Sequence, residues 1–136
     1  MFTQHLIPRF SETDALGHIN NTVIPNWFES ARIDVFRLFN EELDLTNWNL
    51  IIANLSVDFK KQIYYGFDVD ILTSIERIGN SSFVVYQEAV QQNEICASGR
   101  VTMVYFNFQT QKPEPIPSAI REHLEKHLNF QESPNS

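Results

Sequence analysis

The residues whose types and spacing could do chemistry gather in one polar segment near the N-terminus, residues 11–21. Glu12, Asp14 and His18 stand close together there, and a helix is expected to begin directly after them. A carboxylate in this place could attack an electrophile or activate water. The free N–H groups of the helix would stabilise a developing oxyanion. These groups are sufficient for acyl transfer to water. A thioester is a good candidate substrate because thiolate is a fair leaving group.

Several neighbours of Asp14 could complete this site, and each also has an ordinary structural interpretation. Gly17 allows a tight turn or a close approach of the backbone to a ligand. His18 could be a general acid, although a hydrogen bond that holds the loop in place is the favoured role. Asn20 could hold the attacking water or the substrate carbonyl, and it could also cap the helix. Glu12 is interpreted as a residue that caps or orients the loop.

The helix expected after this segment is long. Pro25 fits its first turn, where the missing N–H costs nothing, and the helical pattern fades near Asn40. Apolar residues recur at helical spacing on one face and also occur on nearly the opposite face, so we expect other elements to enclose the helix. The candidate N-caps are Asn20, Asn21 and Thr22, the main apolar face holds Ile24, Trp27, Phe28, Ala31, Val35, Leu38 and Phe39, and Ile33 and Phe36 lie opposite.

Glu29 lies just inside this helix and could be a second carboxylate of the site. An ion pair between helices or at an interface is the favoured alternative. Arg32, three residues later, is a candidate partner, because residues at this spacing are neighbours on a helix.

Runs in which apolar and polar residues alternate follow the helix and predict strands. These runs cover residues 51–59, 67–76, 83–90 and 95–108, and the first of them is expected to bury one face. A short strand is also expected within the first ten residues. A last short helix is expected over 118–127, with Ser118 as its N-cap.

The order of these elements is a strand, a long helix and four antiparallel strands joined by short turns, which predicts an α+β domain. One antiparallel sheet that curls around a single helix would explain why that helix is apolar on more than one side. Such a sheet leaves its edge strands open, and pairing between two copies would close one edge. The pattern therefore predicts a homodimer.

Length, charge and cysteine content narrow the class of protein. The 136 residues suit one domain at 1–130, and the polar tail at 131–136 is expected to be disordered. A net charge of −7 disfavours nucleic acid as a partner. No signal peptide and no membrane-spanning run is recognisable. The single cysteine, Cys96, is interpreted as a structural thiol and fits a cytoplasmic location.

Metal binding is not expected from the four histidines. His123 and His127 have helical i, i+4 spacing, but no third ligand completes a recognisable site.

The residues of the polar segment also match a known family. The string Glu-Thr-Asp-Ala-Leu-Gly-His-Ile-Asn-Asn at 12–21, followed by Trp-Phe-Glu-Ser-Ala-Arg at 27–32, resembles the 4-hydroxybenzoyl-CoA thioesterase-like branch of the hotdog proteins. The resemblance is strongest over residues 7–37 and extends more loosely to about residue 117. A Thr-Asp pair alone carries little information, whereas the whole string followed by this helix is fairly specific.

The resemblance implies a hotdog fold, in which a five-stranded antiparallel sheet wraps around one long central helix. It implies a homodimer or homotetramer with active sites at the dimer interface. It also implies that Asp14 acts as nucleophile or general base. The polarising N–H of the family falls near Val23 or Ile24. Many relatives have tyrosine near position 24, and Pro25 has no N–H, so the sequence leaves the choice of oxyanion donor open.

The expected function is hydrolysis of acyl-CoA thioesters to free acid and coenzyme A, by a cytoplasmic enzyme that needs no metal or other cofactor. The adjacent pair Lys60 and Lys61 could contact the phosphates of coenzyme A, or could be a solvated strand end. One alternative is a hydratase or dehydratase that uses Asp14 and His18 as base and acid. Another is a non-catalytic module that binds acyl-CoA or an acyl carrier protein.

Overall fold

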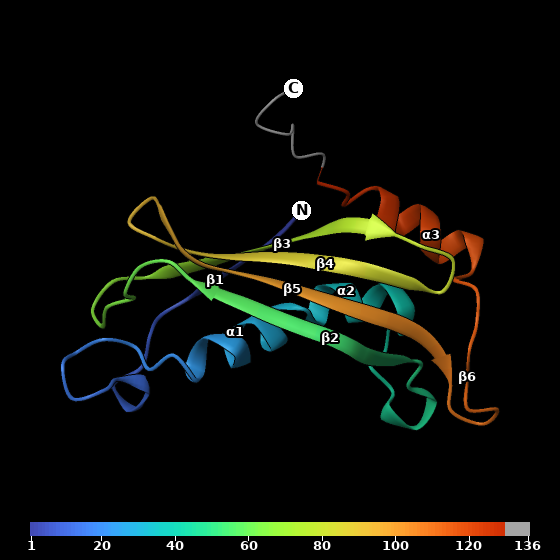
Figure 1. The fold of residues 1–136 in the computed structure, drawn as a ribbon, viewed down its shortest axis with the longest axis horizontal. Coiled ribbons are helices and arrows are strands. Elements are labelled where there is room, and N and C mark those ends of the chain that lie inside the picture. The colour runs from blue at the N-terminus through green and yellow to red at the C-terminus, as the bar shows by residue number, and fades with distance from the viewer. Residues whose placement is uncertain (130–136) are drawn as a thin grey trace.

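The structure, a computed structural model, describes residues 1–129 and consists of one antiparallel sheet with two consecutive helices beneath it (Figure 1). The strands are β1 (Phe2–Leu6), β2 (Leu50–Phe59), β3 (Val69–Ile78), β4 (Ser82–Gln91), β5 (Glu94–Asn107) and β6 (Lys112–Pro113). They follow the order β1-β3-β4-β5-β2, and β6 pairs with β5. The tail expected at 131–136 lies outside the described residues.

The four strands expected after the helix are present and antiparallel, but two features of the sheet differ from expectation. β2 pairs with β5 and not with β3, its successor in the chain, so the segment 60–68 crosses the end of the sheet to reach β3. The expected count of five strands is wrong, because the short strand β6 pairs with the end of β5.

The long helix expected beneath the sheet is divided into α1 (Val23–Ala31) and α2 (Ile33–Phe39), so the expectation of one continuous helix is wrong. The Arg32 N–H is shared between the carbonyls of Phe28 and Glu29, at 3.1 Å each. The side-chain amide of Gln87, on β4, donates to the same Phe28 carbonyl at 2.8 Å. A side chain that inserts into the hydrogen-bond ladder bends a helix, and this contact accounts for the break at Arg32.

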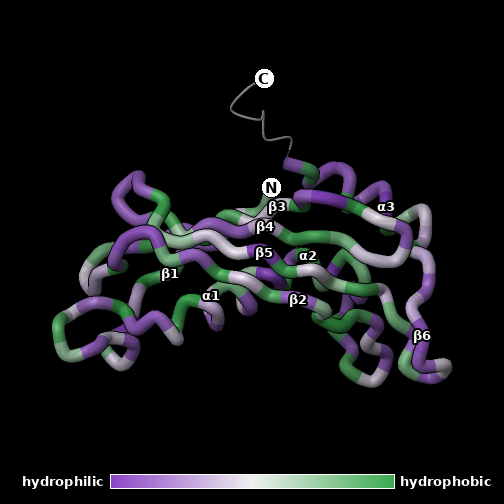
Figure 2. The backbone as a smooth tube through the Cα atoms, in the orientation of Figure 1, coloured by the Kyte–Doolittle hydropathy of each residue, from purple (hydrophilic) through white to green (hydrophobic). Residues whose placement is uncertain are grey.

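The core lies between the helices and the inward face of the sheet. Hydrophobic stretches lie along the strands and the helices (Figure 2), and residues 83–87 of β4, in the centre of the sheet, are all buried. Gly99 of β5 lies against the buried ring of Phe28, and a Cβ at this glycine would come within 3.1 Å of two ring atoms. The missing side chain of Gly99 therefore lets α1 pack close to the sheet. At the other end, α3 (Ser118–Glu125) buries Leu124 against α2 and β3, and its N-cap is Pro117 rather than Ser118.

β2 is an edge strand, and most of its side chains are exposed. The expectation that this strand buries one face is wrong for a single protomer, since Leu55 is 47% and Phe59 48% exposed. Unpaired backbone groups beside exposed apolar side chains form a surface that can pair with another strand. None of the helices within residues 1–129 is long and apolar enough to cross a bilayer.

Candidate active site

Asp14 lies in a closed loop between the 3-10 helix η1 (Phe10–Glu12) and α1. Its Oδ1 accepts hydrogen bonds from the Leu16 N–H at 2.8 Å and from the His18 N–H at 3.1 Å. Its own N–H donates to the His18 carbonyl at 2.7 Å. No hydrogen bond within residues 1–129 uses Oδ2, and the side chain is 37% exposed. One oxygen of the carboxylate is therefore fixed by the backbone, and the other is available to a ligand or to water.

His18 contributes to this loop through its backbone more than through its ring. The ring Nδ1 lies 3.9 Å from Asp14 Oδ2, which is longer than a hydrogen bond. The ring packs edge-on against Tyr64, with 5.0 Å between the centroids. These contacts fit a residue that shapes the loop.

Gly17 turns the loop between Asp14 and His18. Its φ is +79°, in the left-handed region that glycine adopts without steric penalty. Nothing lies within 4 Å of the position that a Cβ would take, so the requirement for glycine is conformational. The Gly17 carbonyl accepts a hydrogen bond from the Tyr65 N–H at 3.1 Å.

The start of α1 supplies further polar groups. Asn20 Oδ1 accepts from the N–H and the hydroxyl of Thr22 at 2.9 and 2.8 Å, which leaves Nδ2 without a partner in the described part of the chain. The Val23 N–H already donates to the Asn20 carbonyl at 2.9 Å. The Ile24 N–H makes no hydrogen bond within residues 1–129, and Pro25 has none to offer. Of the two amides considered from the sequence, Ile24 is the one left free to donate to an oxyanion.

Glu12 connects the loop to α1. Its Oε2 accepts a hydrogen bond from Trp27 Nε1 at 2.8 Å, and its Oε1 accepts from the Arg9 N–H at 2.7 Å. Its backbone carbonyl accepts from the Asn20 N–H at 2.9 Å. The side chain is only 12% exposed. The sequence interpretation of Glu12 as an orienting residue agrees with these contacts.

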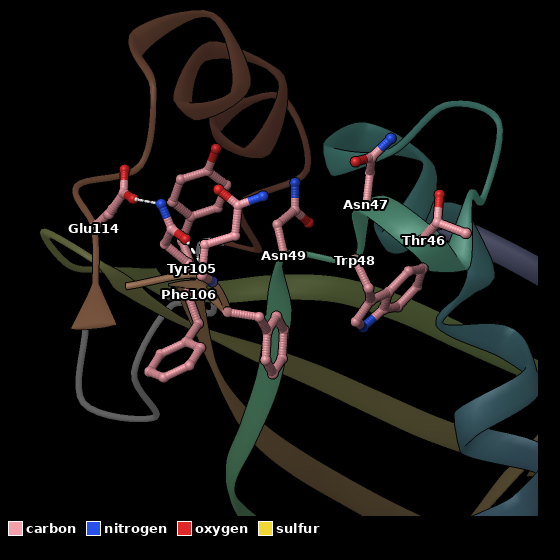
Figure 3. A pocket seen from close by; sticks show the side chains of 10 residues that line it. Thr46, Asn47, Trp48, Asn49, Tyr105, Phe106 and Glu114 are labelled. Atoms are coloured by element: carbon pink, nitrogen blue, oxygen red, sulfur yellow. Dashed lines mark hydrogen bonds between the residues drawn. The ribbon is translucent and has the colours of Figure 1, made fainter. Parts of the chain in front are cut away.

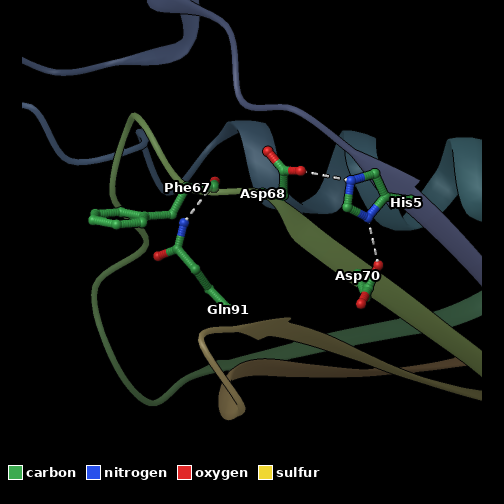
Figure 4. Close-up of polar contacts among 5 residues, drawn as sticks. All are labelled: His5, Phe67, Asp68, Asp70 and Gln91. Carbon is green, nitrogen blue, oxygen red and sulfur yellow. Dashed lines mark hydrogen bonds and ion pairs between the residues drawn. The ribbon is translucent and has the colours of Figure 1, made fainter.

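The segment 60–68 forms the other wall of the loop. The Ile63 carbonyl accepts a hydrogen bond from the Ile19 N–H at 2.7 Å. Gln91, the last residue of β4, fastens this segment through its side-chain amide. Its Oε1 accepts from the Tyr64 N–H at 3.0 Å, and its Nε2 donates to the Tyr64 carbonyl at 2.9 Å. The same Nε2 donates to the Phe67 carbonyl at 3.0 Å (Figure 4). Sequence reasoning placed Gln91 in a polar turn and missed this role.

Lys60 and Lys61 begin the same segment, next to the end of β2. Both backbone N–H groups donate to the carbonyl of Cys96, at 2.8 and 3.0 Å. The Lys61 ammonium pairs with Glu94 at 3.0 Å, whereas exposed Lys60 has no ion pair among the described residues. Cys96 itself is buried, and burial raises the pKa of its thiol, so this residue is not built as a nucleophile.

Glu29 is not joined to Asp14 by a hydrogen bond or ion pair in residues 1–129. Its Oε2 lies 4.0 Å from Arg32 Nη2, so the expected ion pair with Arg32 is present at long range. The guanidinium of Arg32 is buried, donates to Gln87 Oε1 at 3.1 Å, and has its pKa lowered by burial. Glu29, in contrast, is 68% exposed.

Two apolar cavities lie beside α2 and the start of β2, and Glu29, Phe36 and Trp48 line both. The first, of about 330 Å³, is completed by Ser30, Ile33, Leu43 and Leu45, and the second by Leu50, Ile51, Ile52 and Met103. The segment that walls the Asp14 loop follows the other end of β2, and a ten-residue strand spans about 30 Å. Within one protomer, Asp14 and the apolar cavities therefore lie at opposite ends of β2.

A third cavity, which is more polar, is shown in Figure 3, and Trp48 lines it as well as both apolar cavities. Amide and aromatic side chains line most of it, and its residues are Thr46, Asn47, Trp48, Asn49, Tyr105, Phe106, Asn107, Phe108, Gln109 and Glu114. It contains none of the site residues expected from the sequence. Across residues 1–129, no group of three or more His, Cys, Asp or Glu side chains is placed to hold a metal ion.

Known proteins with the same architecture bear on this site. A predicted thioesterase from Bacillus stearothermophilus is 48% identical, with a TM-score of 0.91, over 94% of this chain and 96% of that chain. A thioesterase from Thermus thermophilus, solved in complex with coenzyme A and zinc, is 29% identical, with a TM-score of 0.80, over 91% of each chain. The uncharacterized protein YsmA of Bacillus subtilis is 30% identical over 105 residues, which cover 76% of this chain and 71% of YsmA.

The match to a protein family covers both the Asp14 loop and the sheet. The model of the thioesterase-like superfamily matches residues 8–124, which include every candidate site residue discussed above. Together with the antiparallel sheet over the α1–α2 pair, this match supports the α+β hotdog architecture that the sequence predicted. The chain belongs to the thioesterase-like superfamily.

Proposed function

We propose that this protein hydrolyses acyl-CoA thioesters to a free acid and coenzyme A, with Asp14 as its catalytic residue. The observation that carries this proposal is the pattern of hydrogen bonds to the two oxygens of the Asp14 carboxylate. Two backbone N–H groups fix one oxygen, and the other oxygen accepts no hydrogen bond within residues 1–129 and lies 3.9 Å from His18 Nδ1. Membership of the superfamily, and the coenzyme A bound to the Thermus thioesterase, support the substrate class.

In the proposed reaction, Asp14 Oδ2 attacks the thioester carbonyl carbon or takes a proton from the water that attacks it. Negative charge then develops on the carbonyl oxygen, where the Ile24 N–H and Asn20 Nδ2 donate hydrogen bonds. The carbon–sulfur bond breaks, and coenzyme A leaves as its thiolate. By either route the acyl carbon gains the hydroxyl of water and the sulfur gains its proton. Gly17 and His18 keep the loop in the conformation that aims Asp14.

The proposal includes a homodimer in which β2 pairs with β2 of a second copy. Two-fold symmetry makes this pairing antiparallel, so the Leu50 end of one strand lies beside the Phe59 end of the other. The Asp14 loop of one protomer then adjoins the apolar cavities of its partner, which are lined by Phe36, Trp48 and the carboxylate of Glu29. The cavities become the acyl pocket, and each site draws on both chains.

Lys60 is proposed to contact the phosphates of coenzyme A. It follows the end of β2, close to the loop that carries Asp14, and its charge is exposed and not paired within residues 1–129. Lys61 contributes less, because Glu94 already neutralises it at 3.0 Å. On a protein with a net charge of −7, an unpaired lysine beside the site is a local attraction for phosphate.

The test is release of free thiol from a panel of acyl-CoAs that runs from acetyl to long-chain and aryl forms. The wild-type protein should release thiol, and Asp14→Asn should reduce turnover by at least about 10²-fold. The asparagine keeps an oxygen for the Leu16 and His18 N–H groups, so the fold should be intact. Asp34→Asn, in α2, is the matched control and should keep wild-type turnover.

Each outcome of this experiment has a definite meaning. Full turnover by a folded Asp14→Asn protein would exclude Asp14 as the catalyst. Saturable binding of acyl-CoA without thiol release would exclude hydrolysis and favour a binding module. A change in enoyl absorbance without thiol release would favour a hydratase.

A further inference from the structure

Two glutamines of β4 point into the core, where apolar side chains are usual. Gln87 and Gln91 share the inward face of this strand with Phe83, Val85 and Ala89, and all five are buried. The amide of Gln87 acts at the break between α1 and α2, where it contacts Phe28 and Arg32. The amide of Gln91 acts elsewhere, at the end of the sheet that carries the Asp14 loop.

The side-chain amide of Gln91 makes hydrogen bonds to the segment 63–67 of the kind that the backbone of a neighbouring strand would make. Tyr64 forms an antiparallel bridge with His18 of the Asp14 loop, in which the Ile63 carbonyl and the Tyr65 N–H face that loop. Tyr64 lies between them, and its N–H and carbonyl face the opposite way, toward Gln91. The side-chain amide of Gln91 pairs with both groups, at 3.0 and 2.9 Å, as the backbone of a neighbouring strand would. Its second N–H reaches the Phe67 carbonyl at 3.0 Å.

The segment held by Gln91 in turn fixes the half of the loop that binds Asp14. The Ile19 N–H donates to Ile63 at 2.7 Å, and the Gly17 carbonyl accepts from Tyr65 at 3.1 Å. His18 lies between these two contacts, and its N–H holds Asp14 Oδ1 at 3.1 Å. A displacement of the segment would therefore move the amide that aims the Asp14 carboxylate.

We propose that Gln91 is a positioning residue for Asp14, which it holds in place through the segment 63–67 and without any contact with the substrate. This inference rests on the proposed function, in which Asp14 is the catalyst. The expected effect is on kcat rather than on KM, because misplacing a catalytic group by about 1 Å can reduce the rate by about 10²-fold. Binding of the acyl group in the cavities at the far end of β2 should be little affected.

The first test compares Gln91→Met with Gln87→Met. Methionine fills a similar space without an amide, and the two positions lie on the same face of the same strand. Gln91→Met should lower kcat by about tenfold or more with KM within about threefold, and amide hydrogen exchange at Ile19 and Tyr65 should accelerate. Gln87→Met should lower stability, because it leaves Arg32 and Phe28 without their partner, yet it should leave kcat and both exchange rates close to wild type.

The second test uses Gln91→Glu, which separates positioning from packing. An ionised carboxylate still accepts from the Tyr64 N–H but repels the carbonyls of Tyr64 and Phe67, whereas a protonated one can donate to a carbonyl. The ratio of kcat for Gln91→Glu to wild-type kcat should therefore rise as the pH falls. Taking the ratio removes the pH effects that are common to both proteins. The corresponding ratio for Gln91→Met should not change with pH.

The outcomes separate this inference from the proposed function. If Asp14→Asn is inactive while Gln91→Met and Gln91→Glu keep wild-type kcat and slow exchange at Ile19 and Tyr65, only the role of Gln91 is overturned. If the wild-type protein releases no thiol from any acyl-CoA, the proposed function fails. Amide hydrogen exchange at Ile19 and Tyr65 then still tests whether Gln91 holds the loop. Unchanged exchange rates in Gln91→Met would show that it does not.

Discussion

The indole N–H of Trp27 donates a 2.8 Å hydrogen bond to the carboxylate of Glu12, and this contact joins the loop of Asp14 to α1. Glu12 also accepts the N–H of Arg9 on its carboxylate and the N–H of Asn20 on its backbone carbonyl. The beginning and the end of the Asp14 loop are therefore hydrogen-bonded to a single residue, Glu12, which is itself hydrogen-bonded to α1.

Trp27→Phe should weaken this connection without emptying the core. Phenylalanine keeps an aromatic ring in the buried position of Trp27 and removes only the N–H donor and part of the ring. The Glu12 oxygen is then left in a position of low exposure without its partner, which should lower the free energy of unfolding by about 1–3 kcal/mol. Urea unfolding measures this loss, and thiol release should fall with it because the loop is less restrained.

Glu12→Gln is the matched variant for this contact. Its amide has a single oxygen, which can accept from the Trp27 N–H or from the Arg9 N–H but not from both, so this variant should also lose stability. Equal unfolding free energies for wild type and Trp27→Phe would contradict a structural role for the Glu12–Trp27 contact.

His18→Phe should have a much smaller effect on turnover than Asp14→Asn. Any residue at position 18 other than proline keeps the backbone N–H that holds Asp14, and phenylalanine can replace the ring that packs against Tyr64. We expect kcat to fall by less than about tenfold, which is below the 10²–10⁴-fold range of general acid–base catalysis. A loss as large as that of Asp14→Asn would show instead that the imidazole takes part in proton transfer.

Sequence reasoning identified the Asp14 loop because its parts are close in the chain. The contacts among Asp14, Gly17, His18 and Asn20 span a few residues, and the start of the helix that follows them is marked by Pro25. The alternating strands were also recognisable, since a period of two needs only local information. The choice between the Val23 and Ile24 amides stayed open in the sequence. It depends on one backbone hydrogen bond, from the Val23 N–H to the Asn20 carbonyl, which residue types alone do not reveal.

The features that sequence reasoning missed depend on contacts between distant residues. The helix breaks at Arg32 because Gln87 reaches it from β4, and the loop is fastened by Gln91 from the end of the same strand. One signal was available: the alternation of β4 puts both glutamines on the face of Phe83, where an apolar residue is normal. The sequence around β2 does not indicate that this strand pairs with β5. The segment 60–68, which crosses the end of the sheet, has the composition of an ordinary turn.

Gly99→Ala should destabilise the protein through the packing of α1. The added Cβ would lie 3.1 Å from two atoms of the Phe28 ring, so the helix or the ring must shift. Overpacking of this kind costs about 1–3 kcal/mol, which urea unfolding can measure. Phe28→Leu should be less harmful in the Gly99→Ala background than alone, because residues in contact are not additive. Additive losses would mean that Gly99 and Phe28 do not share the strain.

Leu55→Lys should dissociate the proposed dimer. Leu55 is 47% exposed on β2, and a charge at this position disfavours edge-to-edge pairing of two copies. We expect sedimentation to show a monomer that is folded but has lost most of its turnover, because Asp14 no longer adjoins the partner's apolar cavities. Ile95→Lys, at a position 41% exposed on β5, is the control and should stay dimeric. An active Leu55→Lys monomer would contradict a site shared between two chains.

The stability of the sheet edge at β1 should depend on pH through His5. Its Nδ1 lies 2.8 Å from Asp70 and its Nε2 lies 2.8 Å from Asp68 (Figure 4). Carboxylates only accept, so both hydrogen bonds form only when both ring nitrogens carry a proton. The hydrogen bonds to Asp70 and then to Asp68 raise the pKa of His5 above its ordinary value. The folded protein therefore binds this proton more tightly than the unfolded chain does.

The direction in which the stability changes with pH follows from the linkage between folding and proton binding by His5. The stabilisation by His5 is fully present below the unfolded pKa of about 6.5 and is lost as the pH rises through the higher folded pKa. His5→Gln lacks this titration, so it should be less stable than wild type at about pH 6, and the difference should shrink toward about pH 9. Urea unfolding of both proteins across this range measures the difference. A gap that stays constant with pH would mean that protonation of His5 does not contribute to the stability of the fold.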